Sequence, residues 1–261
     1  MAKQKLGQHF LFDKNILKKI AFLVQGYGSK GVLEIGAGLG TLTEQLIDLF
    51  EHTYTVELDK SLYNRLVQKF GDNKKVTIIN DDILNVNIEA LPVSIAVGNI
   101  PYYITTPIIF KLLEAANIKQ FSLLMQKEVA TRIVAKPGSK DYGILSVNVQ
   151  YQSDVNIAFK VNKGSFSPPP KVDSLVVTFS KKDTPLQLTR SLRILTQKAF
   201  GMRRKTLFNN LKGLLGEDTA EFIKQFGIAP TARAEEIDVE TFVKMTEALI
   251  KKGALSPLKT I

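Results

Sequence analysis

Short apolar runs rich in β-branched residues, alternating with helix-like segments, constrain the fold of this chain more than any other feature. Five runs of strand length lie in its first half: VLEIG (32–36), TYTVE (53–57), VTIIN (76–80), VSIAVG (93–98) and FSLLMQ (121–126). Helical patterns lie between them: TLTEQLIDLF (41–50), SLYNRLVQKF (61–70) and TPIIFKLLEAA (106–116). Strands buried on both faces that alternate with helices predict a parallel, doubly wound α/β sheet.

The pattern changes after residue 140. GILSVNVQY (143–151) and DVNIAFKV (154–161) are predicted to be adjacent strands joined by a short polar turn, and SLVVTFS (174–180) to be another strand. Strands this close in the sequence favour an antiparallel edge on the otherwise parallel sheet.

The last third of the chain is predicted to be helical. Residues 181–190 are polar and contain a proline, which is typical of a linker, and four helical segments follow. We therefore expect an α/β domain over residues 1–182, with a basic arm over residues 1–20, and a small all-helical domain over residues 183–261.

The composition excludes several classes of chemistry. The 261 residues include no cysteine and only two histidines, His9 and His52. Disulfides, thiolate zinc sites, a cysteine nucleophile and a histidine-rich metal site are therefore excluded, and we expect no metal. No apolar run reaches the length of a signal peptide or a membrane span. These features predict a soluble, cytoplasmic protein that binds no membrane, with a monomer as the default state.

The excess positive charge is confined to two segments. The net charge is +10, from 35 basic and 25 acidic residues. Residues 1–20 carry a net charge of +4, and residues 181–216 contain nine basic residues and a single acidic one. Clustered Lys and Arg side chains release counterions from phosphates, so this distribution is typical of a nucleic-acid footprint. A surface that only keeps the protein soluble is the alternative. Binding to an anionic membrane surface is a third, less favoured option, since no strongly amphipathic basic helix with an aromatic face is evident.

A glycine-rich turn follows the first predicted strand. In EIGAGLG (34–40), Gly36 and Gly38 let the backbone approach a ligand closely, and the helix that follows offers free N–H groups. A dinucleotide fingerprint requires a glycine three residues after Gly38, but that residue is Thr41. The spacing therefore disfavours a nicotinamide or flavin enzyme, and a turn that binds no ligand stays an alternative.

Acidic side chains follow the next two strands. Glu57 lies 21 residues after Gly36, where a carboxylate can accept hydrogen bonds from both hydroxyls of a ribose. Asp82 follows the third strand, where it can hold the exocyclic amine of a bound adenine. Each acid alone is typical of a solvated strand end, but together they lie at the sheet edge where ligands of open α/β sheets bind.

The sequence GNIPYY (98–103) after the fourth strand predicts the chemistry. An exocyclic amine is a poor nucleophile because its lone pair is delocalised into the ring. The Asn99 side-chain oxygen and the Ile100 carbonyl can accept its two N–H groups and raise its electron density. Pro101 fixes the turn, and Tyr102 offers a flat face on which an unpaired base can stack. A proline turn with packed aromatic residues is the alternative.

Two features outside this cluster are further candidates. Phe166 precedes a proline run that stiffens its loop, so it is either a second stacking face or part of a plain connection. Arg203, Arg204 and Lys205 are predicted to lie at the start of a helix, where cations oppose the macrodipole. We expect these three residues to contact phosphates, with a solvated charge cluster as the alternative.

Together these motifs resemble those of one family, the adenine N6,N6-dimethyltransferases of small-subunit ribosomal RNA. The similarity extends along the chain: LGQHFL (6–11), EIGAGLGTLT (34–43), VELD (56–59), GNIPYYITTPI (98–108), LMQKEVATRIVAKPGSKDYGILSV (124–147), FSPPPKVDS (166–174) and AFGMRRKTLFNNL (199–211). The resemblance implies a class I, Rossmann-like methyltransferase with a seven-stranded sheet, S-adenosyl-L-methionine as methyl donor and an RNA-binding helical domain. It also implies dimethylation of two adjacent adenines in the 3′-terminal hairpin of that RNA, in a precursor of the small ribosomal subunit.

The resemblance further implies roles for individual residues. It places His9, Leu11 and Gly36 in the cofactor site, Glu57 on the ribose, Asp82 near the adenine amine and Asn99 close to the reactive methyl group. The sequence departs from the family at one position, because bacterial relatives commonly have Asn where this chain has His9. Histidine can still donate and accept hydrogen bonds, but protonation would change its contact.

Three other functions share part of this pattern. A relative acting on large-subunit ribosomal RNA, of the antibiotic-resistance type, would use the same chemistry, but AFGMRRKTLFNNL (199–211) is more similar to the small-subunit type. A non-catalytic ribosome-assembly factor on the same scaffold would be expected to lack the glycine turn or Asn99, and both are present. A DNA adenine methyltransferase would need a base-reading module, for which the helical segment leaves little room.

Overall fold

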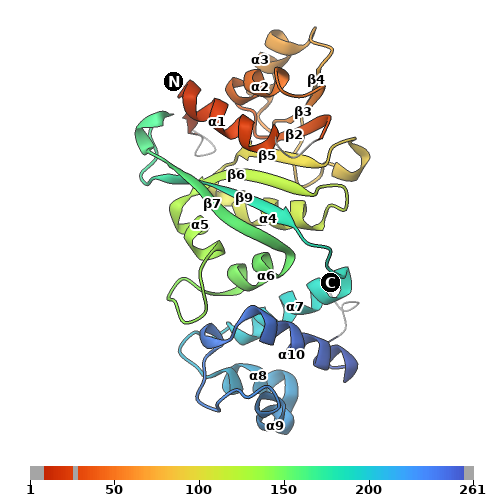
Figure 1. The fold of residues 1–261 in the computed structure, drawn as a ribbon, viewed down its shortest axis with the longest axis vertical. Helices are drawn as coiled ribbons and strands as arrows, with labels where there is room; N and C mark the ends of the chain where they lie inside the picture. The colour runs from red at the N-terminus through yellow and green to blue at the C-terminus, as the bar shows by residue number, and fades with distance from the viewer. Residues whose placement is uncertain (1–8, 26–28, 256–261) are drawn as a thin grey trace. The chain divides into compact units, whose positions relative to one another are not determined.

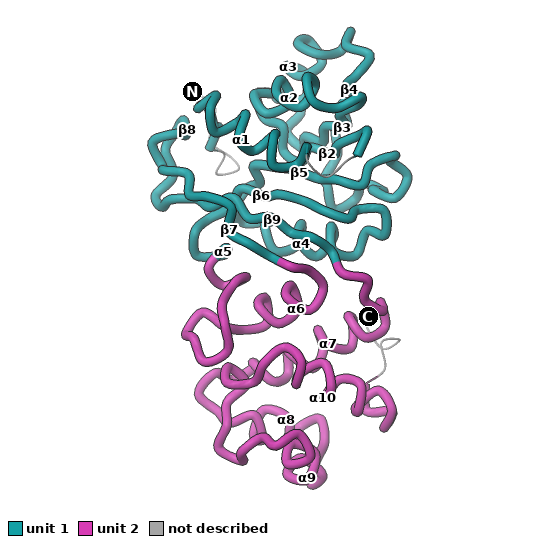
Figure 2. Tube along the Cα trace, in the orientation of Figure 1, with its two compact units in different colours: residues 1–130, 155–181 teal, residues 131–154, 182–261 magenta. Residues whose placement is uncertain are grey.

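A computed structural model of the chain describes residues 9–25 and 29–255, so the first eight residues of the expected basic arm, Lys3 and Lys5 among them, lie outside it. The chain divides into two units, and Figure 2 colours them separately. Unit 1 comprises residues 1–130 and 155–181, and unit 2 comprises residues 131–154 and 182–261. Unit 2 thus includes residues 131–154, which the sequence analysis assigned to the α/β domain.

Unit 1 is built on a seven-stranded sheet (Figure 1). Its strands, in spatial order, are β4 (Val76–Ile79), β3 (His52–Val56), β2 (Gly31–Ile35), β5 (Ile95–Asn99), β6 (Gln120–Gln126), β9 (Ser174–Lys181) and β7 (Ser153–Val161). Neighbours from β4 to β6 pair in parallel, whereas β9 runs antiparallel to β6. The expected seven-stranded, mostly parallel sheet with an antiparallel edge is therefore confirmed.

Three helices of unit 1 follow strands in the expected alternation, α2 (Thr41–Ile47), α3 (Lys60–Phe70) and α4 (Thr105–Glu114), and α1 (Lys14–Gln25) precedes β2. In α1, Leu17, Ile20 and Val24 are spaced by three or four residues and lie buried in a cluster with side chains of β5 and β6. A two-stranded antiparallel ribbon joins β1 (Phe10–Leu11) to β8 (Phe166–Ser167). This ribbon attaches the start of the described chain to the proline-rich loop.

Unit 2 is helical. After α5 (Lys127–Ile133), which begins in unit 1, its helices are α6 (Ile144–Gln152), α7 (Leu186–Ala199), α8 (Leu207–Leu215), α9 (Thr219–Lys224) and α10 (Val239–Lys251). They enclose an apolar core whose fully buried members include Leu195, Leu211, Phe242 and Met245. No helix among the residues the structure describes is long and apolar enough to cross a membrane.

Two predictions in this part of the chain are wrong. The segment predicted as a strand over 143–151 is helix α6. Apolar residues alternate with polar ones from Leu145 to Val149, a period of two that predicts a strand. In the helix the intervening Ser146 and Asn148 are also buried, and Ser146 Oγ and Asn148 Nδ2 donate hydrogen bonds within unit 2, so the alternation marks no exposed face. The expected linker is likewise shorter, because α7 already begins at Leu186.

Candidate functional site

One pocket of unit 1 gathers most of the predicted site residues. It lies where β2, β3, β4 and β5 end and contains about 1040 Å³ of empty space, part of it open to solvent. Ten predicted residues line it: His9, Leu11, Gly36, Gly38, Glu57, Asp82, Asn99, Ile100, Pro101 and Tyr102. Its lining residues come from the turn after β2 and from the ends of β3, β4 and β5, the edge at which ligands of open α/β sheets bind. The described residues contain no group of three or more His, Asp or Glu side chains suited to hold a metal ion.

The glycine turn between β2 and α2 forms one wall of the pocket. Gly38 and Gly40 have φ angles of 58° and 74°, in the left-handed region that side chains with a Cβ rarely adopt. A Cβ at Gly40 would lie 2.5 Å from the Phe70 ring, and one at Gly38 would lie 3.1 Å from the Phe10 ring. Glycine is therefore required both by the backbone conformation and by the close packing behind the turn.

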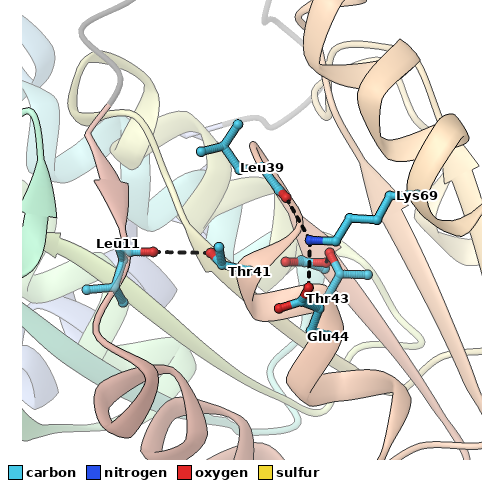
Figure 3. A network of polar contacts seen from close by, with 7 residues as sticks. Leu11, Leu39, Thr41, Thr43, Glu44 and Lys69 are labelled. Atoms are coloured by element: carbon cyan, nitrogen blue, oxygen red, sulfur yellow. Dashed lines mark hydrogen bonds and ion pairs between the residues drawn. The ribbon is translucent and has the colours of Figure 1, made fainter.

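Side-chain contacts hold this turn in place, as Figure 3 shows. Thr41 Oγ1 donates to the Leu11 carbonyl oxygen at 3.1 Å, which attaches the start of α2 to β1. Lys69 Nζ lies 2.6 Å from Glu44 Oε1 and donates to the Leu39 carbonyl oxygen at 3.4 Å. The turn is thus anchored to β1 and to α3 before any ligand binds.

Glu57, the first residue after β3, holds the turn from the opposite side. Its side chain is buried, Oε2 accepts a hydrogen bond from Gly38 N at 2.9 Å, and Oε1 accepts one from Asp59 N at 2.9 Å. Burial raises the pKa of Glu57, and these two N–H donors partly offset that rise. A carboxylate has about four lone-pair sites, so about two remain for a ligand in the pocket.

Glu34 is a buried carboxyl to which the sequence analysis gave no role. It lies in β2 and lines the pocket, and its Oε2 accepts hydrogen bonds from Thr43 Oγ1 at 2.6 Å and Thr55 Oγ1 at 3.1 Å. Burial raises the pKa of Glu34 from 4.5 to about 7, although both hydroxyls act to lower it. The sequence does contain a signal for this buried carboxyl, because Glu34 is an acidic residue inside a strand predicted to be buried on both faces.

Glu34→Gln is expected to remove a pH-dependent loss of stability. The folded protein keeps a proton on Glu34 that the unfolded chain releases above pH 4.5. The stability from this group is therefore fully present below pH 4.5 and is lost as the pH rises to about 7. The free energy of unfolding falls by about 3 kcal/mol over this pH range. Glutamine can accept the same two hydroxyls, so the variant should gain Tm relative to the wild type between pH 5 and pH 8. Parallel Tm curves for the two proteins would contradict this.

Asn99 is the last residue of β5, and its amide is oriented by the chain beside it. Asn99 Nδ2 donates to the His9 carbonyl oxygen at 3.1 Å, which leaves Oδ1 without a partner among the described residues. The Ile100 carbonyl oxygen also receives no hydrogen bond from any of them. The Pro101 carbonyl, by contrast, accepts from Ile104 N at 3.2 Å and holds the turn. Two adjacent residues therefore present free acceptors at the pocket.

Tyr102 is half-buried beside these acceptors. Its hydroxyl lies 3.1 Å from Ser174 Oγ, and burial raises the pKa of the phenol. The His9 imidazole stacks on the Tyr102 ring, with 5.6 Å between the ring centroids and 29° between the planes. The Nδ1 atom of His9 donates to the Pro168 carbonyl oxygen at 2.8 Å. His9 thus contacts the predicted stacking face as well as lining the pocket.

Phe166 does not line the pocket, and its role as a second stacking face stays a prediction. Its backbone pairs with Leu11 in the β1–β8 ribbon, and its side chain is only 3% exposed. Because the backbone of Phe166 is paired in this ribbon, its ring packs within the apolar cluster that includes Leu17 and Val97.

Arg203, Arg204 and Lys205 lie in unit 2, in the exposed turn between α7 and α8. Helix α8 begins at Leu207, and the Thr206 side chain caps it. The three residues therefore precede the helix and do not lie at its start, where the sequence predicted them. Arg203 Nη2 donates to the Lys140 carbonyl oxygen at 3.1 Å, which attaches this turn to Lys140.

Comparison with known proteins places this geometry in a family. Residues 1–251 match the family model described as "Ribosomal RNA adenine dimethylase". This chain belongs to the ribosomal RNA adenine dimethylase family. The protein named "Ribosomal RNA small subunit methyltransferase A" of Caldanaerobacter subterraneus subsp. tengcongensis is 40% identical over 261 residues, which cover 95% of this chain and 97% of the relative.

Two solved structures resemble the dimethylase described here. A dimethyladenosine transferase from Plasmodium falciparum is 26% identical, with a TM-score of 0.78, and the match covers 94% of this chain and 98% of that one. The 23S rRNA methyltransferase ErmE is 25% identical, with a TM-score of 0.70, and the match covers 92% and 99%. With the sheet order, these likenesses confirm the class I methyltransferase fold.

The pocket of this dimethylase fits the S-adenosylmethionine that the family uses. A Cβ at Gly36 would lie 3.4 Å from the Asn99 carbonyl oxygen, so the glycine keeps space open between the turn and β5. Glu57 supplies free carboxylate lone pairs, and Asp82 lines the same pocket from the end of β4. Leu11 adds an apolar wall.

Proposed function

We propose that this dimethylase transfers methyl groups from S-adenosyl-L-methionine to N6 of two adjacent adenines in the 3′-terminal hairpin of small-subunit ribosomal RNA, during biogenesis of the small ribosomal subunit. The observation that carries the proposal is the pair of free acceptors, Asn99 Oδ1 and Ile100 O, in one pocket with the glycine turn and Glu57. The 40% identity to a protein named for the small subunit supports this choice of RNA.

The cofactor would be held by the turn and by the acids at the strand ends. Gly36 and Gly38 give it close approach to the backbone, Glu57 accepts its ribose hydroxyls, and Asp82 accepts its adenine amine. When bound, S-adenosylmethionine supplies an electrophilic methyl group. The protein then contributes mainly proximity and orientation, and no covalent enzyme intermediate is needed.

The two free acceptors prepare the target amine. Adenine N6 carries two N–H groups, and Asn99 Oδ1 and Ile100 O can each accept one. Hydrogen bonds to both pull the nitrogen toward a tetrahedral geometry and localise its lone pair. After the first transfer one N–H remains, so a single acceptor suffices for the second. The Tyr102 ring supplies a face for the unpaired base.

The test of this function is methyl transfer to three substrates side by side. Small ribosomal subunits lacking the modification, naked large-subunit RNA and double-stranded DNA are each incubated with labelled S-adenosylmethionine and then digested to nucleosides. We expect label only in N6,N6-dimethyladenosine from the small subunits. Label only in large-subunit RNA would assign the chain to the function named for ErmE, and no label despite cofactor binding would favour a non-catalytic scaffold.

We expect the basic turn of unit 2 to bind RNA phosphates. Arg203, Arg204 and Lys205 are exposed and form no ion pair with any described residue, so their charges are available to phosphates. Replacing all three by Ala should weaken binding to small ribosomal subunits and lower the slope of log K against log salt by about 2. Filter binding over a salt series measures both.

A matched control removes three exposed lysines elsewhere in unit 2. Lys212, Lys224 and Lys251 lie on α8, α9 and α10 and carry the same total charge. Replacing them by Ala should leave the salt slope close to that of the wild type. Equal slopes for the two triple variants would mean that net charge alone, and not the turn, determines RNA binding.

A further inference from the structure

We propose that Lys181 is an acylation site, at which the Lys181 amine takes the acyl group of an acyl phosphate while Lys119 binds the phosphate. Lys119 directly precedes β6, and Lys181 is the last residue of the antiparallel strand β9. Both lysines therefore lie at the edge of the sheet where β5 and β6 begin, whereas the pocket lies where the parallel strands end. The proposed site is thus separate from the methyl-transfer site and does not depend on that function.

The two lysines form a cross-strand pair of like charges. Gln120 lies opposite Ser180 in the antiparallel register of β6 and β9. The next pair along these strands is Lys119 and Lys181, and Lys181 N donates to the Lys119 carbonyl oxygen at 2.8 Å. Side chains directly opposite each other share one face, with β-carbons roughly 5 Å apart, and like charges there are destabilising. Neither lysine forms an ion pair with a residue that the structure describes, so no direct carboxylate contact relieves this repulsion.

Both amines are held at the same turn after helix α4. Lys181 Nζ donates to the Ala115 carbonyl oxygen at 2.6 Å, and Lys119 Nζ donates to the Ala116 carbonyl oxygen at 3.2 Å. Glu89 is at this turn too, where its Oε1 accepts from Ala116 N at 2.9 Å. Two basic side chains and one acidic side chain thus surround two consecutive residues. The excess positive charge favours an anionic ligand at this place.

The half-buried Lys181, and not the exposed Lys119, is placed to act as the nucleophile. Burial, and then the charge of Lys119, lower the pKa of Lys181 from 10.5 to about 8, although Glu89 acts to raise it. At pH 7.5 roughly a quarter of such amines are neutral, against roughly 0.1% for a lysine with an ordinary pKa. Desolvation and a neighbouring cation are the means by which a lysine becomes a nucleophile near neutral pH.

The reaction moves an acyl group from phosphate to nitrogen. The neutral Lys181 amine attacks the carbonyl carbon, a C–N bond forms, and the bond from that carbon to the phosphate oxygen breaks. Inorganic phosphate leaves with the electron pair, and the proton lost from the nitrogen passes to solvent. Lys119 stabilises the negative charge on the leaving phosphate. The amide product keeps one N–H for the Ala115 carbonyl and no longer repels Lys119.

The experiment compares two acetyl donors on the full chain at pH 7.5. Acetyl phosphate carries the anionic group that Lys119 would bind, whereas the thioester N,S-diacetylcysteamine carries none. The internal control is Lys182, the next residue, whose Nζ lies 2.9 Å from Asp154 Oδ1. An Asp-specific protease releases both lysines in one peptide, residues 173–182, in which mass spectrometry measures the acetylation rate of each.

We expect acetyl phosphate to modify Lys181 roughly 10-fold faster than Lys182, because lower basicity cancels part of the gain in neutral amine. The ratio of the two rates should be smaller with the thioester. The rate at Lys181 should also level off above about pH 8, whereas that of an ordinary lysine rises toward pH 10.

Variants at the turn should change the rate at Lys181 in opposite directions. Lys119→Gln removes the neighbouring cation and should slow acetylation by acetyl phosphate by roughly threefold or more, whereas Lys119→Arg should keep the rate. Glu89→Gln keeps an acceptor for Ala116 N but removes the negative charge, so it should speed the reaction. The control is Lys74→Gln, which lies before β4, four strands from β6. That separation is roughly 19 Å, beyond the Debye length of about 8 Å, so the rate should not change.

Other outcomes would overturn the proposal. Equal rates at Lys181 and Lys182 with acetyl phosphate would remove Lys181 as an acylation site. An unchanged rate in a folded Lys119→Gln protein, or an equal ratio of the two rates with both donors, would remove Lys119 as the group that binds phosphate. A slower rate in Glu89→Gln would contradict the electrostatic cause.

Discussion

Asn99→Ala is expected to slow methyl transfer by roughly 10²- to 10³-fold while cofactor binding stays mostly intact. The substitution removes Oδ1, one of the two acceptors placed for the adenine amine, and the Ile100 carbonyl cannot replace it because backbone carbonyls do not rotate freely. Losing one preorganised hydrogen-bonding group costs roughly 10²- to 10³-fold in rate. Single-turnover transfer of labelled methyl to small ribosomal subunits measures this loss, and calorimetry measures the cofactor Kd.

The control for this prediction is Asn73→Ala. Asn73 lies outside the pocket, in the turn before β4, where its Oδ1 accepts from Lys75 N at 2.9 Å. Its loss should leave the single-turnover rate unchanged. Because Asn99 Nδ2 also orients the chain at His9, the Tm of Asn99→Ala should be compared with that of the wild type. Wild-type activity in a folded Asn99→Ala protein would refute the assigned role.

Features that depend on neighbours in the sequence could be predicted without the structure. Strands β2, β5 and β6 were predictable because both of their faces are buried, which demands continuous apolar runs. The pocket edge followed from this, since residues after parallel strands meet at one edge of the sheet, as Glu57, Asp82 and Asn99 do. The glycine turn was predictable because only glycine adopts its left-handed backbone readily.

Features that depend on distant pairing were not predictable from local patterns. Pairing of β8 with β1 determines the position of Phe166. This pairing brings Phe166 opposite Leu11, although the two residues lie far apart in the sequence. The stack of His9 on Tyr102 and the hydrogen bond from His9 to Pro168 depend on the same ribbon. Helix α6 escaped prediction because its polar residues are buried among partners in unit 2.

Glu57→Ala is expected to lower the affinity for S-adenosylmethionine by at least about 100-fold. The carboxylate has two functions, since it binds the N–H groups of Gly38 and Asp59 and keeps lone pairs for the ribose. Alanine leaves the two N–H groups without acceptors, which costs roughly 1–3 kcal/mol of stability for each group that stays buried. It also removes the contacts to the ribose. Calorimetric titration without RNA measures the Kd, and thermal unfolding reports the cost to the turn.

Two further variants, Glu57→Gln and Glu44→Gln, test whether cofactor affinity depends on the carboxylate at position 57. Glutamine at position 57 presents one oxygen and one NH₂ group to two N–H donors, so one donor faces another and the cofactor affinity should stay low. Glu44 lies in α2 beside the same turn, but its partner is Lys69 at the protein surface. Its loss should leave the cofactor Kd nearly unchanged, because an exposed ion pair contributes little. Near wild-type affinity in Glu57→Gln would mean that the carboxylate does not organise the turn, and the ribose would then need another acceptor in the pocket.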